Sequence, residues 1–425
     1  MLLLLYYIPF YIMSELEKKM KYLKWAAIVI LSFGLGVLFV QYLSVHPLQM
    51  SLYLVGTMIV LFGLILLMVF GFKKWSLVIA IVLSLGLFVA GHLTMTKIIL
   101  NRPDPRPVPE LTRSTDDPGL GHTAVVYFTH GEPETYNPIG WINQFNEFDE
   151  QEIAFIPMIA RPFFFNALRN SYLEVGKSDH HMMHEQMIQA LEEAYRAEGD
   201  ETTKFYLSFL DDNPRPDAAA IQALNEGASK IIVSEVFLTI SNHTAEGEHL
   251  IKELEIEDRF NIPVEYTGPL YDSDLLKSMF VARANANIGD TPKEKVGILL
   301  VGHGQPDEWD VEWPTETEQE IGFREDVINL FIADGYAPEN ISLAWMSFKE
   351  PKPEVAIEAF LDNGIEKLLF FPAAISADAI HSQYDIPELV YEADFPEGFP
   401  VLNMGAWNDD PIVILAIKEK IDGLK

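Results

Sequence analysis

Three long stretches without charged residues dominate the first hundred positions of the chain. They run from Trp25–Leu43, Leu52–Phe72 and Trp75–Met95. Each approaches the ~20 apolar residues that a helix needs to cross a bilayer. Because three adjacent runs of this length do not suit the core helices of a soluble domain, we predict a transmembrane anchor of three helices over residues 25–100. Residues 1–24 form an N-terminal tail.

The tail and the loops suggest an orientation for these spans. Residues 1–13 are apolar but too short to cross a bilayer, and they are either an interfacial piece or precede the true start of the protein. Lysines before the first span and at Lys73–Lys74 favour a cytoplasmic position for these segments. Three passes then place the following domain on the extracytoplasmic side, although Arg102 and Arg106 after the third span favour the opposite.

After a proline-rich and charged linker at residues 101–121, the pattern changes to short apolar runs alternating with amphipathic segments. Runs such as Gly297–Val301, Ile231–Ile240 and Leu368–Ile375 are typical of buried parallel strands. Strands that alternate with helices predict an α/β fold with parallel sheets flanked by helices.

The same pattern occurs twice, which predicts two similar halves at residues 122–290 and 291–425. Pro214–Lys230 aligns with Pro351–Lys367 without a gap, at an offset of 137 residues. Each segment reads Pro-x-Pro-acid, then a helix, then Gly before a strand. The first half carries an insertion at about residues 141–185 that the second half lacks.

Charge is distributed unevenly along the 425 residues. Residues 1–100 hold two of the 62 acidic residues and seven of the 30 basic ones, so the remainder carries 60 acids, 23 bases and a formal net charge of −37. Such a surface repels nucleic acid and attracts cations. We therefore expect no nucleic-acid partner.

Several chemistries are excluded by composition and motif. The chain has no cysteine, which excludes disulfides, thiolate metal sites and cysteine nucleophiles. It also lacks a Gly-x-Ser-x-Gly elbow, a phosphate-binding Walker loop and a dinucleotide glycine fingerprint.

Two histidines stand where apolar runs end, His303 in Gly-His-Gly and His381 in Ala-Ile-His-Ser-Gln. Ligands of open α/β sheets collect beyond the carboxyl ends of the strands. Imidazole binds Fe, Co, Ni and Zn, and it also accepts a proton near neutral pH. His303 and His381 are therefore candidate metal ligands and catalytic bases; the alternative is that each is a loop residue that caps a helix.

Other histidines repeat or extend this pattern. His130 and His243 occupy the corresponding places in the first half, where they either form a second metal position, line the same cleft or are structural. His180, His181 and His184 begin a predicted helix, and the first and last share a face suited to a metal; the alternative is that they are solvated or line a substrate site. The acidic run Asp307–Asp326 is interpreted as a solvated helical face rather than a path for cations.

The order of these motifs resembles the class II tetrapyrrole chelatases, the ferrochelatases and sirohydrochlorin cobaltochelatases, over residues 123–425. Gly302-His303-Gly304-x-Pro306 is similar to the metal-binding strand end of that family. Phe371–Pro387 resembles its catalytic stretch, with Pro372, Asp378, Tyr384 and Asp385 matching. His381 stands where ferrochelatases have glutamate, and the cobaltochelatase branch has histidine there before Asp-Ile-Pro.

The first half resembles ferrochelatase more closely. Tyr172-x-x-Val175-Gly176-x-Ser178 is similar to a segment beside the porphyrin pocket, and Ser241-Asn242-His243-Thr244 to a Ser/Thr-rich loop. The resemblance implies that substrate is bound by side chains from both halves: Tyr172, Ser178, Ser241, Thr244 and Tyr384.

Together with the predicted spans, the resemblance implies a membrane-anchored, lyase-type chelatase that inserts Fe²⁺, Co²⁺ or Ni²⁺ into a porphyrin or sirohydrochlorin in a cleft between the halves. The metal is then a substrate, and no organic cofactor is expected. The partners would be the tetrapyrrole and the membrane. The alternatives are a membrane-tethered haem- or metal-binding protein that kept the fold without turnover, and a sirohydrochlorin cobalt or nickel chelatase.

Overall fold

The computed structural model describes residues 2–102, 107–150 and 156–425. The chain divides into two compact units. The first comprises Met1–Asp104 and Tyr136–Leu173, and the second comprises Pro105–Thr135 and Glu174–Lys425. Positions 103–106 of the predicted linker and 151–155 of the predicted insertion lie outside the described residues.

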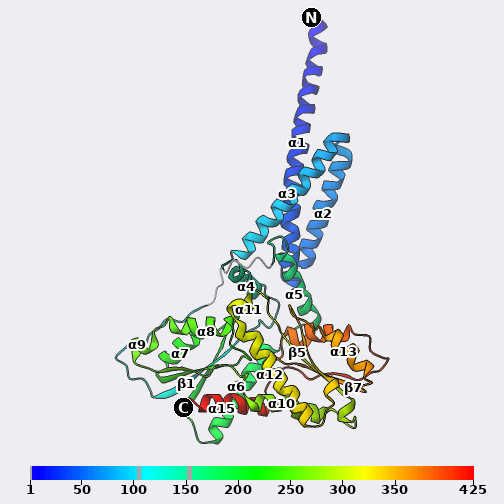
Figure 1. Ribbon diagram of the computed structural model, residues 1–425. Helices are drawn as coiled ribbons and strands as arrows, with labels where there is room; N and C mark the ends of the chain where they lie inside the picture. Colours follow the sequence, from blue (N-terminus) through cyan, green and yellow to red (C-terminus); the bar gives the residue numbers. More distant parts are fainter. Residues whose placement is uncertain (1, 103–106, 151–155) are drawn as a thin grey trace. The chain divides into compact units, whose positions relative to one another are not determined.

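Three long helices form most of the first unit: α1 (Leu2–Ser44), α2 (Pro47–Gly71) and α3 (Lys74–Leu100) (Figure 1). Their apolar parts contain 30, 25 and 27 residues, which is long enough and apolar enough to cross a membrane. The three predicted spans are thus present as helices. The predicted tail is not a separate element, because α1 begins at Leu2 and runs without interruption into the first span.

Two glycines allow α1 and α3 to approach closely. A Cβ atom on Gly36 would lie 2.1 Å from the carbonyl oxygen of Phe88, and one on Gly91 would lie 2.1 Å from that of Phe33. Small residues are typical of such helix contacts in membranes, because packing rather than hydrophobic burial holds the helices together. The crossing of α1 and α3 therefore depends on the absence of both side chains.

We expect Gly91→Ala to destabilise the first unit by about 1–3 kcal/mol, the usual cost of overpacking, because its new methyl group meets backbone atoms that cannot rotate away. The measurement is the thermal unfolding temperature of the full chain in detergent micelles. Gly86→Ala on the same helix is the matched control, since nothing lies within 4 Å of a Cβ there. Equal losses in the two variants would contradict the close crossing.

Part of the predicted insertion folds into the first unit as α4 (Ile139–Glu150) and α5 (Arg161–Val175). The Tyr136 hydroxyl donates to the carbonyl of Ser44 at 2.9 Å, and Arg169 donates to the carbonyls of Tyr42 and Val45 at 2.5 and 3.2 Å. The last carbonyls of a helix have no partner within it. These donors therefore satisfy the carboxyl end of α1.

The second unit contains two parallel four-stranded sheets with the same strand order, β2-β1-β3-β4 and β6-β5-β7-β8. This confirms the predicted α/β fold with two similar halves. The strands of the first sheet are β1 (His122–Thr129), β2 (Thr203–Phe209), β3 (Ala228–Glu235) and β4 (Val264–Tyr266). Those of the second are β5 (Val296–Gly302), β6 (Ile341–Trp345), β7 (Lys367–Pro372) and β8 (Val401–Asn403).

Helices cover both sheets. The helices of the first half are α6 (His180–Ala197), α7 (Pro216–Asn225), α8 (Asn242–Lys252), α9 (Ile256–Phe260) and α10 (Asp274–Asn287). Those of the second are α11 (Trp309–Glu312), α12 (Pro314–Ala333), α13 (Pro353–Asp362), α14 (Ile386–Tyr391) and α15 (Pro411–Asp422). Three short turns complete the unit: η1 (Lys293–Lys295), η2 (Pro338–Asn340) and the π-helical turn η3 (His381–Asp385).

One hydrophobic core joins the two sheets. Alternate residues of a strand point to opposite faces: Val125 and Tyr127 of β1 enter a core shared with Ile298 and Leu300 of β5. Helices α6, α10, α12 and α15 contribute to this central core and lie between the sheets (Figure 1). The opposite faces pack on separate outer cores that include side chains of α7 and α8 on one sheet and of α13 and α14 on the other.

Two predicted strands end earlier than the apolar runs suggested. The run Ile231–Ile240 continues beyond β3, which ends at Glu235, and the run Leu368–Ile375 continues beyond β7, which ends at Pro372. The remaining apolar residues are loop residues such as Val236 and Leu238 that are buried in the central core. Burial, rather than strand conformation, explains their apolar character.

Candidate functional site

Four histidines lie at the carboxyl ends of the strands of both sheets. His130 follows β1 and His303 follows β5, while His243 lies in the first turn of α8 and His381 opens η3. The ring centroids of His130 and His243 are 4.8 Å apart, and those of His303 and His381 are 5.3 Å apart. The fold therefore brings together each pair of histidines that the repeat identified.

Backbone and carboxylate acceptors fix the orientation of three of these rings. Nδ1 of His303 donates to the carbonyl of Gly304 at 2.7 Å, and Nδ1 of His130 donates to that of Gly131 at 3.0 Å. Nδ1 of His381 lies 2.6 Å from Oδ2 of Asp385. Since carbonyls and carboxylates only accept, each Nδ1 carries the proton and each neutral ring keeps its lone pair on Nε2, the arrangement typical of metal-binding histidines.

The glycine after each strand-end histidine is required by the turn. Gly131 and Gly304 have φ angles of 91° and 78°, in the left-handed region that favours glycine. A Cβ atom on Gly304 would also lie 2.4 Å from the carbonyl oxygen of Ser347. The His-Gly sequence thus delivers an imidazole from a turn that no larger residue fits.

The two facing rings of the second half have opposite electrostatic environments. Burial and the neighbouring His381 lower the pKa of His303 to about 4. Burial also opposes protonation of His381, but the hydrogen bond and charge of Asp385 outweigh it and raise the pKa of His381 above its usual value. At neutral pH His303 is therefore an unprotonated imidazole, and His381 is the more basic partner.

We expect Asp385→Asn to move the pH dependence of Co²⁺ binding to lower pH. Protonated imidazole cannot bind a metal, so affinity falls as the pH drops through the pKa of His381, and removing the carboxylate lowers that pKa. The measurement is a Co²⁺ titration of the full chain at several pH values. Glu388→Gln, which alters a carboxylate bonded to Tyr384, is the control. An unchanged midpoint in Asp385→Asn would contradict this role of Asp385.

Glu132 joins the site although only its place in the repeat pointed to it. Its carboxylate accepts the backbone N–H of Ile380 at 2.9 Å, and the Ser178 hydroxyl hydrogen-bonds to it. Burial raises the pKa of Glu132, while the nearby His381 and His130 lower it. The signal in the sequence is the acid or amide that follows each His-Gly, Glu132 in the first half and Gln305 in the second.

Glu320 and Arg324 of α12 hold the turn at His303 in place through hydrogen bonds to backbone groups. Oε1 of Glu320 accepts the backbone N–H of His303 at 2.8 Å, and Arg324 lies 3.8 Å from the same carboxylate. Arg324 also donates to the carbonyls of Leu300 and Ala344 at 3.2 and 2.7 Å. A Cβ atom on Gly302 would lie 2.1 Å from Oε1 of Glu320, so the glycine makes room for this pair.

The interpretation of residues 307–326 as a solvated face is wrong for the inner side of α12. Glu320 is only 3% exposed, and burial next to Glu320 and Asp310 raises the pKa of Glu316 to about 8. The two glutamates are one helical turn apart and share a face. That face is turned into the protein because it supports the His303 turn.

His180 and His184 share a helix face as predicted, with ring centroids 4.5 Å apart, and both are buried. His184 contacts the hydroxyls of Tyr127 and Thr129 at 2.9 and 3.3 Å, and burial lowers the pKa of both rings. They are therefore neutral, buried side chains, and His184 packs against the carboxyl end of β1. His181 points elsewhere, with Nε2 3.4 Å from Glu185.

The residues that the resemblance assigned to substrate binding occupy several environments. Ser241 and Thr244 form a capping box at the start of α8, where their hydrogen bonds are to each other's backbone and side chain. Ser178 is buried, and its Oγ also accepts the N–H of His180 at 3.3 Å. Tyr384 lies on η3 and donates to Glu388, whereas Tyr172 is buried in the first unit beside Tyr136. Ser241 and Thr244 thus cap the start of α8, a structural role that the resemblance did not assign to them.

Among residues 2–102, 107–150 and 156–425, no three His, Asp or Glu side chains are placed to hold a metal ion together. His303 and His381 together offer two imidazole nitrogens, one from each ring. A metal bound there would retain open coordination positions for other ligands.

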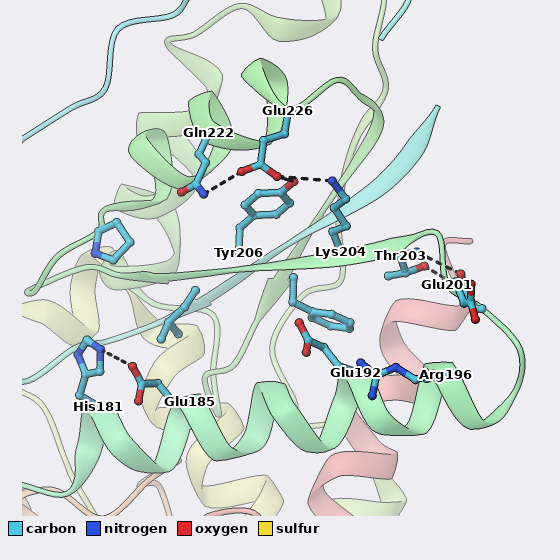
Figure 2. A pocket seen from close by; sticks show the side chains of 14 residues that line it. His181, Glu185, Glu192, Arg196, Glu201, Thr203, Lys204, Tyr206, Gln222 and Glu226 are labelled. Carbon is cyan, nitrogen blue, oxygen red and sulfur yellow. Dashed lines mark hydrogen bonds and ion pairs between the residues drawn. The ribbon is translucent and has the colours of Figure 1, made fainter. Parts of the chain in front are cut away.

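A separate groove of about 710 Å³ lies along the outer edge of β2, between α6 and α7 (Figure 2). His181 is the one histidine among its lining residues. Figure 2 shows Glu226 between Gln222, Tyr206 and Lys204. The carboxylate of Glu226 is bonded to all three side chains, so these polar groups of the groove already have partners within the protein. This groove is distinct from the four-histidine site.

Comparison with known proteins adds a relationship in sequence. A stretch of 101 residues, 23% of this chain, is 31% identical to a sirohydrochlorin cobaltochelatase of Methanothermobacter thermautotrophicus and spans 59% of that protein. The matched stretch agrees with the resemblance to the sirohydrochlorin cobaltochelatases drawn from the motifs, and the chain spans only part of that protein's length. No family model matches the chain.

Two solved structures also align with the chain. SirB from Bacillus subtilis with Fe³⁺ is 15% identical, and the sirohydrochlorin chelatase SirB from Bacillus subtilis subspecies spizizenii in complex with cobalt is 12% identical. Each alignment covers 71% of this chain and 94% of the other, with a TM-score of 0.42.

Proposed function

We propose that this protein, a relative of the tetrapyrrole chelatases, inserts a divalent metal ion into a tetrapyrrole. The observation that carries the proposal is the facing pair of His303 and His381, whose rings are 5.3 Å apart with Nδ1 bonded and Nε2 left for a ligand. Imidazole nitrogens suit Fe²⁺ and Co²⁺, and the pair lies where parallel sheets bind their ligands. Fe²⁺ or Co²⁺ is the proposed metal substrate, and Ni²⁺ is a further candidate.

The reaction exchanges protons for a metal without any change of oxidation state. Two pyrrole N–H bonds break, their protons pass to bases, and the metal replaces them on the macrocycle nitrogens. A neutral His303 is an available ligand at physiological pH, and His381, made more basic by Asp385, is suited to accept a proton. Glu132, whose backbone partner Ile380 adjoins His381, is a second proton acceptor.

Incomplete coordination by the protein favours transfer of the metal. A site that held the ion with four protein ligands would retain it, as structural zinc sites do. Two imidazoles leave positions that macrocycle nitrogens can occupy as they are deprotonated. We place His130 and His243 on the opposite wall of the same cleft, where they line it or hold a second ion.

The three apolar helices tether the chelatase domain to a membrane in this proposal. The lysines before the first span and at Lys73–Lys74 support a cytoplasmic position for these segments, which puts the domain on the extracytoplasmic side. Fusing a reporter enzyme that is active only outside the cytoplasm to the carboxyl end of the chain tests this placement.

The function is tested by visible absorption of the full chain in lipid nanodiscs, mixed with Fe²⁺ or Co²⁺ under anaerobic conditions and with a porphyrin or sirohydrochlorin. Catalysed conversion to the metallated spectrum supports a chelatase. Spectral binding without conversion would replace the proposal with the haem- or metal-binding alternative. The absence of both binding and conversion would refute it.

A further inference from the structure

Six lysines gather at one end of the three-helix bundle. Four precede the first uncharged run on α1, and two stand in the turn between α2 and α3: Lys18, Lys19, Lys21, Lys24, Lys73 and Lys74. The Nζ atom of Lys24 donates to the carbonyl of Gly71 at 3.3 Å, so the lysine-bearing part of α1 adjoins the end of α2 (Figure 1). The two groups of lysines therefore form one surface, the lysine end of the bundle.

Few acidic side chains oppose these charges. Residues 1–102 contain two acids, Glu15 and Glu17, so the six lysines leave a formal excess of four positive charges. Glu15 pairs with Lys18 at 3.2 Å. Lys73 and Lys74 are exposed, and no acidic side chain among the described residues forms an ion pair with either. The lysine end thus contrasts with residues 101–425, whose formal net charge is −37.

The other end of the bundle has no comparable excess. Lys97 and Arg102 are the basic residues at the carboxyl end of α3. Helix α4 contacts this end through Asn146, whose side chain donates to the carbonyl of Leu100 at 3.3 Å. The sequence of α4 holds three acidic residues and no basic one. The positive excess therefore belongs to the lysine end and not to the bundle as a whole.

The lysine end is also where the apolar helices meet the surface of a membrane. Lys24 directly precedes the first uncharged run, and Lys73 and Lys74 separate the second run from the third. The rings of Trp25 and Phe72 contact each other there, with centroids 4.8 Å apart. Tryptophan is typical of the membrane–water interface, and long lysine side chains reach from such positions to the headgroups.

The lysines of α1 and of the turn are directed to a common place. Lys21, Lys24 and Ile28 share one face of α1, and Ile28 is buried in the core of the bundle. That face is turned towards the α2–α3 turn, as the bond from Lys24 to Gly71 shows. Beside the turn, α2 ends with exposed apolar side chains such as Phe70, which is 81% exposed. Positive charges and apolar surface therefore adjoin each other.

We propose that the lysine end binds an anionic phospholipid, with the phosphate of its headgroup held between the lysines of α1 and those of the α2–α3 turn. Basic residues next to a span attract acidic lipids, and each lysine adds to the attraction. The apolar surface favours a lipid over a free phosphate ion, because acyl chains can cover it. The proposal concerns the first unit and is independent of the proposed function.

Native mass spectrometry of the full chain released from detergent micelles measures this preference. The chain is incubated with dioleoyl phosphatidylglycerol or dioleoyl phosphatidylcholine, which share acyl chains and differ in headgroup charge. We expect several-fold more bound phosphatidylglycerol, with the difference shrinking as the salt concentration is raised. Equal binding of the two lipids would overturn the proposal. Full displacement of the lipid by an equal concentration of glycerophosphoglycerol, the headgroup without acyl chains, would show an anion site and would also overturn it.

Two matched double variants locate the site. Lys73→Gln/Lys74→Gln removes two charges at the lysine end and is expected to lower the binding of phosphatidylglycerol by about tenfold or more. Lys97→Gln/Arg102→Gln removes two charges at the other end and should have little effect. Lys73→Arg/Lys74→Arg keeps both charges and should keep the binding, which controls for disturbance of the turn. Equal losses in the two glutamine variants, or loss of binding in the arginine variant, would contradict the proposal.

Discussion

Replacement of His303 by alanine is expected to lower the rate of metal insertion by a factor of about 10²–10⁴, the range typical for loss of a positioned acid–base group. The variant removes the imidazole whose Nε2 faces the site and whose pKa of about 4 keeps it unprotonated at neutral pH. The measurement is kcat/KM for the full chain in nanodiscs, followed by the metallated absorption spectrum.

A second histidine variant controls for changes of charge and fold. His249→Ala removes an exposed imidazole on α8 that pairs with Glu253, and it should leave the rate unchanged. The turn around position 303 is held through its backbone by Glu320 and Ser347, so the His303→Ala protein is expected to fold. Full activity in His303→Ala would remove this residue from the proposed site.

Arg324→Ala is expected to cost about 3–5 kcal/mol of unfolding free energy, because it leaves the buried Glu320 carboxylate without its cation. The guanidinium is fully buried, bonds to the ends of β5 and β6 and lies 4.0 Å from the centroid of the Trp345 ring. The measurement is the urea dependence of unfolding of the full chain, monitored by tryptophan fluorescence.

The double variant Glu320→Gln/Arg324→Met distinguishes an unpaired charge from lost packing. It removes both charges while keeping similar side-chain volumes, so it should recover part of the stability lost in Arg324→Ala. A double variant less stable than the single one would instead show that the pair stabilises the fold through its charges. Arg324→Ala with native stability would contradict the role assigned to the pair.

The repeat made most of the fold predictable. Strand β5 contains the whole predicted run Gly297–Val301 and extends one residue further at each end. The prediction was close because a continuous apolar run closed by glycine is compatible with few structures other than a buried strand. The 137-residue offset placed α7 and α13 in equivalent positions of two sheets with one strand order. Facing histidines followed from that equivalence, because the carboxyl ends of parallel strands share an edge.

Contacts between segments distant in sequence were not predictable. Glu320 lies in an acidic run that the charge pattern alone predicts to be exposed to solvent. It is instead buried, where it accepts a hydrogen bond from the backbone N–H of His303, seventeen residues earlier. Likewise, nothing in residues 139–175 indicates that α4 and α5 belong with the long apolar helices. The hydrogen bonds of Asn146 in α4 to the end of α3 and of Arg169 in α5 to the end of α1 are tertiary contacts, which a local sequence pattern does not reveal.

The helices between the two sheets pack against both of them. Each half is therefore a repeat in sequence but is not expected to unfold independently of the other half. Val125 of one sheet and Ile298 of the other are buried in the same core, so opening either half exposes apolar surface of its neighbour. The two halves should therefore lose structure in a single transition. For a duplicated protein, this coupling means that divergence of one copy is constrained by the folding stability of the other.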